Sequence, residues 1–329
     1  MQKGREIAET SAKTVNAAAQ VNVIPSGEAI GVKLYTDSVF VVGAGSISDE
    51  KGNEVSPAKR AGVLKGDKIV GVNGVKVTDI AGLRRLINGE NGQITLNIIR
   101  KNSALDIPVE AIFSKDTGSY LIGLWVRDSA AGIGTMTFYN PENSTFAALG
   151  HGICDYDTNA LLSAGGGRVG DCSIKGVIKS ENGAPGELLG EFSATKIGEI
   201  VKNTDLGLYG NAEKIPDFPL VPVASRFEVK EGKAQFLCDI DGNGAKAYDI
   251  EITKVSHSAK ISGKNFVFKV CDRRLLEMTG GIVQGMSGSP ILQNGKLVGA
   301  VTHVFVNDAR RGYGIFAENM LDMTNSFGS

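Results

Sequence analysis

The chain of 329 residues is poor in cysteine and has no long apolar run. Its four cysteines are too widely spaced for the paired-thiol pattern of a zinc site, so we expect no bound metal. No Gly-x-x-x-x-Gly-Lys-Ser/Thr pattern occurs, which argues against a nucleotide-dependent enzyme, and we expect no cofactor. No stretch approaches the ~18 consecutive apolar residues of a membrane helix, and the first twenty residues lack the apolar core of a signal peptide.

Charge of one sign is also lacking. Lys and Arg number 35 against 36 Asp and Glu, which gives a net charge of −1 and excludes the strongly basic type of nucleic-acid-binding protein. Hydrophobic residues make up 42% of the chain, an ordinary value for a globular protein. Glycine is abundant, with 43 residues, roughly twice the usual share of ~7%. This composition predicts many turns between short strands.

The first third of the chain shows short apolar runs separated by turn residues. The pattern predicts a short helix at 57–61, a strand at 68–72 and a tight turn at Asn73-Gly74. A second helix follows, capped by Thr78 or Asp79. The run SPAKRAGVLKGDKIVGVNG at 56–74 resembles PDZ domains of the bacterial protease-associated kind.

That resemblance implies a peptide-binding groove. The family has its carboxylate-binding loop where this chain has Ala29, Ile30, Gly31 and Val32. Consecutive backbone N–H groups around a glycine form a nest for a peptide carboxylate, while the strand edge binds the peptide as an added strand. We therefore expect this groove to bind peptide C-termini or the protein's own chain. The alternative is that these four residues only begin a strand.

The strongest chemical signal is the run GMSGSPILQNGKLVGAVTHV at 285–304. Gly285 and Gly288 flank Ser287 and allow the open turn that a nucleophilic serine needs. The run resembles the nucleophile segment of chymotrypsin-like serine peptidases, whose signature is G-x-S-G-x-P before a hairpin. The resemblance implies an oxyanion hole made by the N–H groups of Gly285 and Ser287. It also implies that Thr302, His303 and Val304 lie beside the substrate backbone.

A serine nucleophile needs a general base, and the chain has three histidines. His151 lies in an apolar run broken by glycines, 136 residues before Ser287, and the order His then Ser matches the resemblance. His257 has polar neighbours typical of a surface residue, and His303 is expected to line the cleft. We predict that His151 is the base.

The two halves together resemble one family. A PDZ domain followed by the runs at 127–153 and 281–316 is similar to stage IV sporulation protein B, the PDZ-containing serine peptidase of spore-forming Firmicutes. The resemblance implies an endopeptidase exported from the forespore to the space between the forespore and mother-cell membranes. Such a peptidase cleaves itself and a membrane-bound regulator of an intramembrane protease, which triggers processing of a late mother-cell sigma factor. The resemblance also implies an N-terminal membrane anchor or signal, which we expect to be absent from this chain.

The acid of the catalytic triad stays open at this stage. The family pattern places an essential aspartate fifteen residues before the serine, which is Asp272, and this is the favoured assignment. Asp272 also suits a helix cap or an ion pair with a following arginine. Chymotrypsin-like order instead favours Asp205, 54 residues after His151. The remaining alternatives are Asp155, Asp157 and Asp171.

These observations predict a mainly β protein. We expect an N-terminal tail at 1–27, a PDZ domain (α+β) at 28–114, and a chymotrypsin-like double β-barrel serine peptidase domain at 115–329. The rival hypothesis is a non-catalytic PDZ adaptor with a degenerate peptidase domain. The intact Ser287, His151 and oxyanion glycine favour the enzyme.

Overall fold

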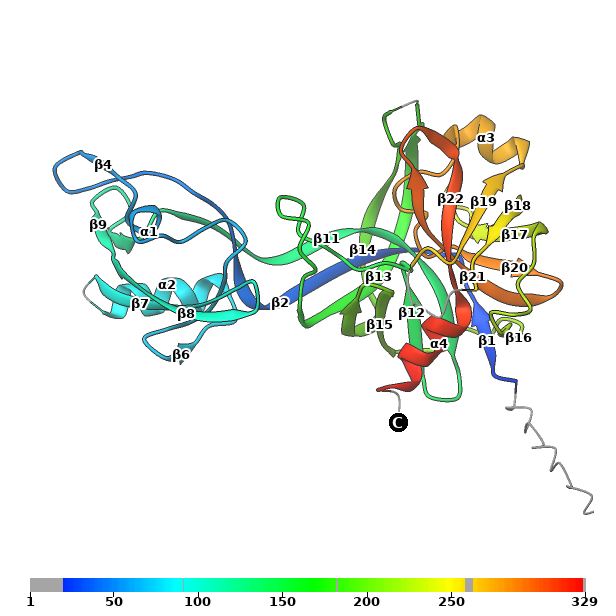
Figure 1. Cartoon of the computed structure of the whole chain (residues 1–329), viewed down its shortest axis with the longest axis horizontal. Helices are drawn as coiled ribbons and strands as arrows, with labels where there is room; N and C mark the ends of the chain where they lie inside the picture. The colour runs from blue at the N-terminus through cyan, green and yellow to red at the C-terminus, as the bar shows by residue number, and fades with distance from the viewer. Residues whose placement is uncertain (1–19, 91, 182, 258–262, 328–329) are drawn as a thin grey trace, which may run out of the picture.

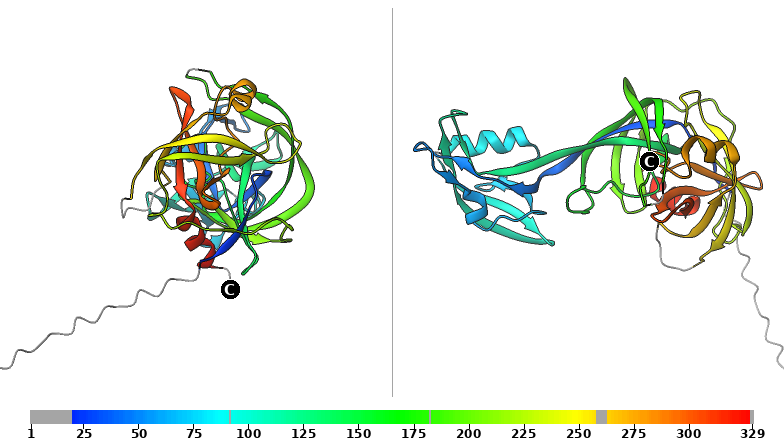
Figure 2. Two further views of the ribbon diagram at one scale, coloured as in Figure 1. Left: turned by 90° about the vertical axis from the view of Figure 1, so that its right-hand side faces the viewer. Right: turned by 90° about the horizontal axis from the view of Figure 1, so that it is seen from above.

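Two long strands organise the computed structural model of the chain, which describes residues 20–90, 92–181, 183–257 and 263–327. Strands β2 (Ala29–Ala44) and β11 (Leu124–Asn140) pair antiparallel and run from a small lobe into a larger body built of β-barrels (Figures 1 and 2). Within the described ranges, none of the helices has the length and apolarity needed to cross a membrane.

The first barrel is built around the inner halves of these two strands. The ladder runs from β11 through β12, β15, β14 and β13 to β2, and β2 pairs back with β11 to close the ring. The added strands are β12 (Thr145–Ala148), β13 (Ala164–Ile178), β14 (Glu187–Thr204) and β15 (Gly207–Ala212). Alternate side chains of this ring fill the interior, as expected for a small closed barrel. They include Ile30, Val32, Leu34, Met136, Phe146 and Leu208.

The second barrel follows in the chain and packs against the first. It closes in the order β17 (Gly232–Cys238), β18 (Lys246–Val255), β19 (Phe266–Val270), β22 (Asp308–Phe316), β21 (Lys296–Phe305) and β20 (Pro290–Gln293). Its core is aromatic, with Phe266 and Phe268 fully buried. A Cβ at Gly314 would lie 2.3 Å from the Phe266 ring, so this glycine makes room for the core.

Short elements complete this body. Strand β1 (Asn22–Pro25) pairs with both β11 and β16 (Val221–Pro222). Helix α3 (Arg273–Thr279) follows β19, and helix α4 (Ala317–Asn325) follows β22. All four cysteines are free thiols.

The small lobe lies between β2 and β11 in the chain and has a core of its own. Its elements are β3 (Ile47–Ser48), β4 (Glu54–Val55), α1 (Pro57–Arg60), β5 (Lys68–Val72), β6 (Val75–Lys76), α2 (Ile80–Gly89), β7 (Gln93–Arg100), β8 (Ser103–Glu110), β9 (Ile112–Ser114) and β10 (Ser119–Leu121). Asp79 caps α2 by accepting the N–H of Gly82 at 2.7 Å. Buried Asp67, from the Gly-Asp step of the PDZ motif, pairs with Arg100 at 2.7 Å.

The predicted fold class is confirmed, because a mainly β chain carries both the PDZ lobe and the double barrel. The strand pairing nevertheless corrects the boundaries expected at residues 28 and 115. Residues 29–36 pair with β11 and β13 inside the first barrel, so the PDZ lobe is an insertion between that barrel's first two strands. Residues 22–25 of the expected tail form β1, while residues 1–19 lie outside the described ranges.

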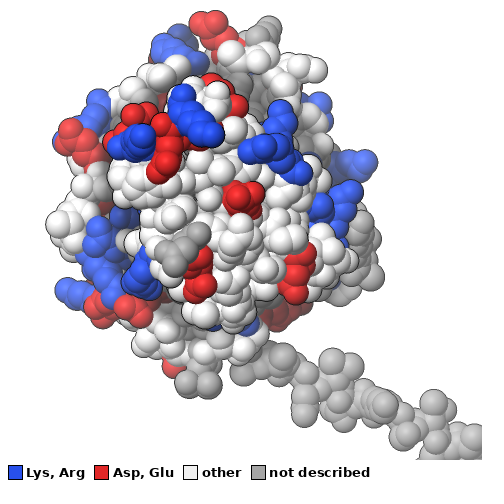
Figure 3. Space-filling model, turned by 90° about the vertical axis from the view of Figure 1, so that its left-hand side faces the viewer, with Lys and Arg blue, Asp and Glu red and all other residues white. Residues whose placement is uncertain are grey.

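The face presented by the PDZ end carries both signs of charge around a largely uncharged centre (Figure 3). This mixture agrees with the net charge of −1.

Candidate active site

Ser287 lies on a turn that precedes β20 and is fixed against the first barrel. Gly285 and Gly288 both have φ near 98°, a left-handed conformation that side chains disfavour. The Thr135 hydroxyl donates to Gly285 O at 2.8 Å, and the Thr137 hydroxyl donates to Gly288 O at 2.7 Å. The Thr135 N–H donates to Ser287 O at 3.0 Å. Strand β11 of the first barrel therefore holds the turn that belongs to the second.

The backbone donors of this turn divide into two groups. Gly288 N–H donates to Val301 O at 2.8 Å, and Met286 N–H donates to Val283 O at 3.2 Å. Among the described residues, the N–H groups of Gly285 and Ser287 have no acceptor. A buried donor without a partner is costly. These two N–H groups are therefore suited to donate hydrogen bonds to an oxyanion.

His151 and Ser287 line one cleft of 540 Å³ between the barrels. His151 follows β12 of the first barrel, and Ser287 comes from the second. The His151 Nδ1 lies 2.9 Å from Gly152 O, which requires the proton on Nδ1 and leaves the Nε2 lone pair free to accept one. Burial lowers the pKa of His151, so the neutral base form is favoured.

The serine hydroxyl points elsewhere in this structure. Ser287 Oγ donates to Thr302 O at 2.9 Å rather than to His151. Rotation about the Ser287 Cα–Cβ bond is needed to direct Oγ toward the base. Catalytic hydrogen bonds of unliganded enzymes often form only in the complex with substrate.

The segment 302–304 of β21, predicted to lie beside the substrate backbone, begins at Thr302, whose carbonyl accepts the Ser287 hydroxyl. Its ladder with β22 is interrupted between Val301 and Val304, and the pairing of β21 with β20 ends at Ala300. The His303 ring lies in the cleft with its centroid 5.1 Å from that of His151. Partial desolvation, followed by the charges of His151 and Lys264, lowers the pKa of His303.

Asp272 is not brought to His151, which corrects the favoured assignment of the acid. Its carboxylate caps α3 by accepting the N–H groups of Arg274 and Leu275. It also pairs with the Arg274 guanidinium at 2.7 Å, and this hydrogen bond lowers the pKa of Asp272. Because a carboxylate directly before a helix satisfies the free N–H groups of the first turn, Asp272 has a structural role.

Asp205 belongs to the loop that lies beside the histidine. This loop joins β14 to β15, and Ala148 pairs with Leu208, so the segments carrying His151 and Asp205 leave the barrel side by side. The Asn203 side chain links them through the backbone N–H and C=O of Ile153, both at 2.8 Å. Asp205, the second candidate for the acid, is therefore the carboxylate that the strand pairing favours.

The other candidate aspartates are occupied elsewhere. Asp155 is buried, accepts hydrogen bonds from Thr158, and pairs with Arg127 at 3.2 Å. Asp157 pairs with the same guanidinium at 3.1 Å. Asp171 lies on β13, opposite Ile30 of β2.

The expected peptide-binding loop of the PDZ domain is also corrected. Residues 29–32 lie inside β2, are buried, and pair with β11 and β13 on both edges, so they cannot receive a peptide. A cleft of 170 Å³, called the PDZ groove below, lies instead between α2 and the start of β11 and is bounded by residues 120–126. Ile122 and Gly123 have backbone N–H groups without an acceptor among the described residues. The overlooked signal is the Ile122-Gly123 step directly before an extended run.

Comparisons with known proteins identify the family of the chain. Residues 118–321 match the model of the SpoIVB peptidase S55 family, and residues 49–100 match a PDZ domain. Solved structures that match include the active form of the Rv3671c protease from M. tuberculosis, with 13% identity, a TM-score of 0.36, and coverage of 61% of this chain and 75% of that one. The HtrA-type protease AlgW with a decapeptide has 12% identity, a TM-score of 0.36, and coverage of 62% and 53%. A search of curated proteins finds no match.

A double barrel with a serine–histidine cleft defines a serine endopeptidase of chymotrypsin-like architecture. The family match spans well over half of the sequence. The chain belongs to the SpoIVB peptidase S55 family and carries a PDZ domain.

Proposed function

We propose that Ser287 and His151 cleave peptide bonds by acyl transfer. Nε2 of His151 takes the proton from Ser287 Oγ as the oxygen attacks the scissile carbonyl, and it then returns that proton to the leaving amine. Water hydrolyses the acyl-enzyme through the same base. The free N–H groups of Gly285 and Ser287 stabilise the oxyanion of both tetrahedral intermediates. The observation that carries this proposal is that the N–H groups of Gly285 and Ser287, in the cleft of His151, have no acceptor within the described part of the chain.

The acid that supports His151 is proposed to be Asp205. The neighbouring loops support this choice, and the Gly152 carbonyl meanwhile holds the Nδ1 proton. Thr302, His303 and Val304 are proposed to pair with the substrate backbone on the acyl side of the scissile bond, because this edge of β21 is left open beside Ser287.

The biological role proposed is sporulation signalling. The name of the matched family supports a sporulation peptidase. From the sequence resemblance we propose that it acts outside the forespore on a membrane-bound regulator of an intramembrane protease, and on itself, to trigger processing of a late mother-cell sigma factor. The PDZ domain supports protein substrates, whose C-termini it is proposed to bind. A direct check replaces the native gene with the Ser287→Ala variant in a spore-forming host. The proposal expects the regulator to stay intact, and normal cleavage of the regulator would refute it.

The chemistry is tested by hydrolysis of an unstructured protein substrate. Ser287→Ala is expected to lower kcat by at least about 10³-fold, with an unchanged melting temperature. Ser173→Ala, an exposed serine on β13, is the matched control. Full activity of Ser287→Ala would reject the nucleophile. Inactivity of the wild type on every substrate would favour the non-catalytic adaptor.

A further inference from the structure

Strand β11 has one edge that stays open between the PDZ groove and the catalytic cleft. Its other edge pairs with β2 at residues 124–127 and 129–135, with register shifts between Trp125 and Val126 and between Arg127 and Ser129. The pairing of β11 with β12 on the open side begins only at Met136. Among the described residues, no backbone group pairs with this open edge before Thr135. An unpaired strand edge is a template for an added strand.

The backbone groups that face this edge can be assigned from the ladder. Met136 N–H donates to Glu28 O on the β2 side, whereas Thr135 N–H donates to Ser287 O on the opposite side. Neighbouring residues of a strand direct their N–H and C=O groups to opposite edges. The register with β2 is regular from Ser129 to Thr135, so Ser129, Ala131 and Ile133 direct both groups to the open edge.

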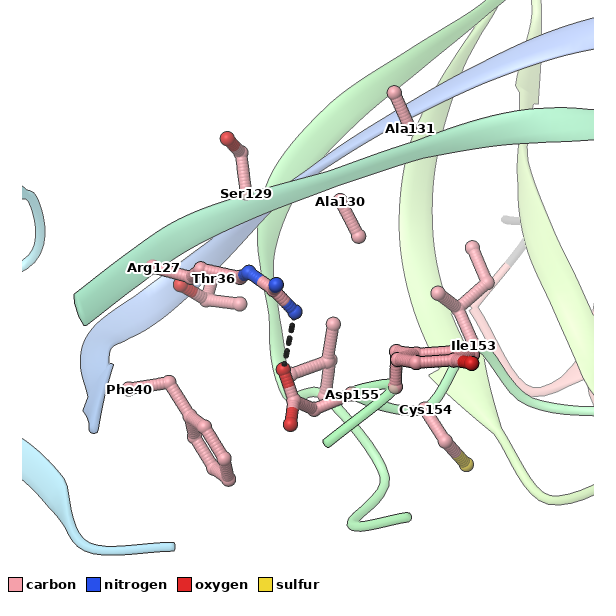
Figure 4. Close-up of a pocket in the computed structure, with 11 residues that line it drawn as sticks. Thr36, Phe40, Arg127, Ser129, Ala130, Ala131, Ile153, Cys154 and Asp155 are labelled. Atoms are coloured by element: carbon pink, nitrogen blue, oxygen red, sulfur yellow. Dashed lines mark hydrogen bonds and ion pairs between the residues drawn. The ribbon is translucent and has the colours of Figure 1, made fainter. Parts of the chain in front are cut away.

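Three clefts follow one another along this edge. The PDZ groove contains Leu124–Val126, a cleft of 320 Å³ contains Arg127 and Ser129–Ala131, and the catalytic cleft contains Ala130–Ile133. Figure 4 shows the middle cleft, where Ser129, Ala130 and Ala131 project from β11 and Arg127 reaches Asp155. The middle and catalytic clefts share Ala130 and Ala131 and the loop after His151. The path from the PDZ groove to Ser287 is therefore lined by one strand.

The far end of the path is built to hold a carboxylate. The N–H groups of Ile122 and Gly123 have no acceptor in the described ranges, and Gly123 has φ 69°, which turns consecutive donors toward one point. Apolar side chains of Ile80, Leu83 and Ile87 line the groove beside it. Asp128 accepts the Ile80 N–H at 3.0 Å and ties the start of α2 to β11 where the groove ends.

Resting on the proposed function, we propose that one extended C-terminal tail of a protein substrate occupies all three clefts at once. A peptide whose C-terminal carboxylate lies at Gly123 pairs antiparallel with β11. Its upstream residues then reach Ile133, beside Ser287, and its N-to-C direction runs from the active site toward the PDZ groove. The leaving side of the substrate is then the side held by the PDZ domain. Pairing with the one strand β11 therefore allows the scissile bond to lie at Ser287 while the C-terminal carboxylate lies at Gly123.

The length of β11 then acts as a ruler for the cleavage site. Leu124 and Ile133 are nine positions apart, a span of about 30 Å in an extended strand. Antiparallel strands pair one residue with one. With one or two residues between the scissile bond and Ile133, the cut falls about 10–12 residues before the free C-terminus. The class of substrate is an extended tail of that length that ends in an apolar residue with a free carboxylate.

The test is a series of peptides with one fixed scissile sequence and tails of four, eight, eleven or sixteen residues, each made as the free acid and as the C-terminal amide. The wild type is expected to cleave the eleven-residue acid at least about tenfold more efficiently than the four-residue acid, because the PDZ groove raises the local concentration of the bond. Amidation is expected to remove this gain at eleven residues and to change little at four. Equal kcat/KM for all tail lengths would show that the length of β11 does not set the distance between the cleavage site and the C-terminus.

A backbone variant separates the open edge from the groove. Ser129→Pro removes an N–H that faces this edge and leaves the ladder with β2 intact. The ratio of kcat/KM between eleven- and four-residue tails is expected to fall to near one in Ser129→Pro and to persist in the control Ser129→Ala. An unchanged ratio in Ser129→Pro would show that the tail does not follow β11.

Binding to the Ser287→Ala variant distinguishes this inference from the proposed chemistry. The eleven-residue acid is expected to bind that variant at least about tenfold more tightly than its amide. Such a preference with an inactive wild type would refute the proposed function and leave tail docking in place. Hydrolysis without any preference for the acid would refute tail docking and leave the function in place.

Discussion

At the scale of residues, the site depends on how three side chains are held. The N–H groups of Gly285 and of Ser287 itself have no acceptor among the described residues, and the Gly152 carbonyl fixes the tautomer of His151. Asp272 is bound by α3 and Arg274, whereas Asp205 lies on the loop beside the histidine. The role assigned to each of these side chains therefore follows from the hydrogen-bond and ion-pair partners that it has in this structure.

The acid assignment predicts opposite effects for two aspartates. Asp205→Asn is expected to lower kcat by about 10²–10⁴-fold with little change in stability, because the imidazolium loses its carboxylate. Asp272→Ala is expected to cost about 1–2 kcal/mol of unfolding free energy, because the α3 cap and its ion pair are lost. Steady-state kinetics and urea unfolding of both variants measure these effects. A larger kinetic loss in Asp272→Ala than in Asp205→Asn, with both variants folded, would reverse the assignment.

Burial of His151 predicts the acidic limb of the pH profile. The reaction needs neutral His151, and burial disfavours the imidazolium, so its pKa lies below 6.5. More than half of the activity is therefore expected to remain at pH 6.5, and the midpoint of its loss lies at lower pH, at the depressed pKa of His151 in the free enzyme. The profile of kcat/KM against pH measures this midpoint. A midpoint at or above pH 6.5 would contradict the burial argument.

At the scale of elements, β11 connects every part of the mechanism. Its first residues line the PDZ groove, its middle lines the catalytic cleft, and its threonines hold the nucleophile turn. The turn can approach this strand only because Gly288 lacks a side chain. A Cβ there would lie 2.1 Å from Thr135 O.

Replacing that glycine is expected to damage both folding and catalysis. Gly288→Ala introduces a methyl group at a left-handed φ and against backbone, which is expected to cost at least about 2 kcal/mol and to abolish activity. Gly176→Ala on β13 is the matched control, because nothing lies within 4 Å of its Cβ position. Thermal unfolding of both variants checks the stability. Equal melting temperatures for the two would show that the turn does not need its close approach to β11.

The sequence predicts local features far better than long-range ones. The Asp79 cap, the α1 and α2 helices and the Ser287 turn all follow from residues close in the chain. The PDZ insertion does not, because β2 is one continuous apolar strand whose halves belong to different cores. The choice of Asp205 as the proposed acid likewise rests on the pairing of β12 with β15, which brings the loop of Asp205 beside the segment that carries His151. Spacing along the chain carries no record of that pairing.

At the scale of the whole molecule, the PDZ lobe is connected to the barrels through two strands rather than one linker. Both β2 and β11 continue into the first barrel (Figure 1). Lys65 and Lys68 of the lobe also contact Asp157 and Ser163 on the segment that follows His151. The PDZ lobe therefore contacts the segment that follows the base, His151.

This topology predicts how the protein responds to one backbone cut. A protease site placed in the exposed turn at Lys115-Asp116 is expected to give two fragments that elute together, because β2 of the first fragment remains a strand of the barrel. Size-exclusion chromatography in native buffer measures this. Separation into two folded pieces would favour a linear order of domains with a boundary near residue 115.

The central claim is that Ser287 is a nucleophile activated in a two-barrel cleft. The most direct measurement is treatment of the full chain with a fluorophosphonate, followed by mass spectrometry of the peptides. We predict a single phosphonyl adduct on Ser287, lost in the Ser287→Ala variant and strongly slowed in His151→Ala. Absence of any adduct, or an adduct on Ser287 that forms at the same rate without His151, would contradict this account.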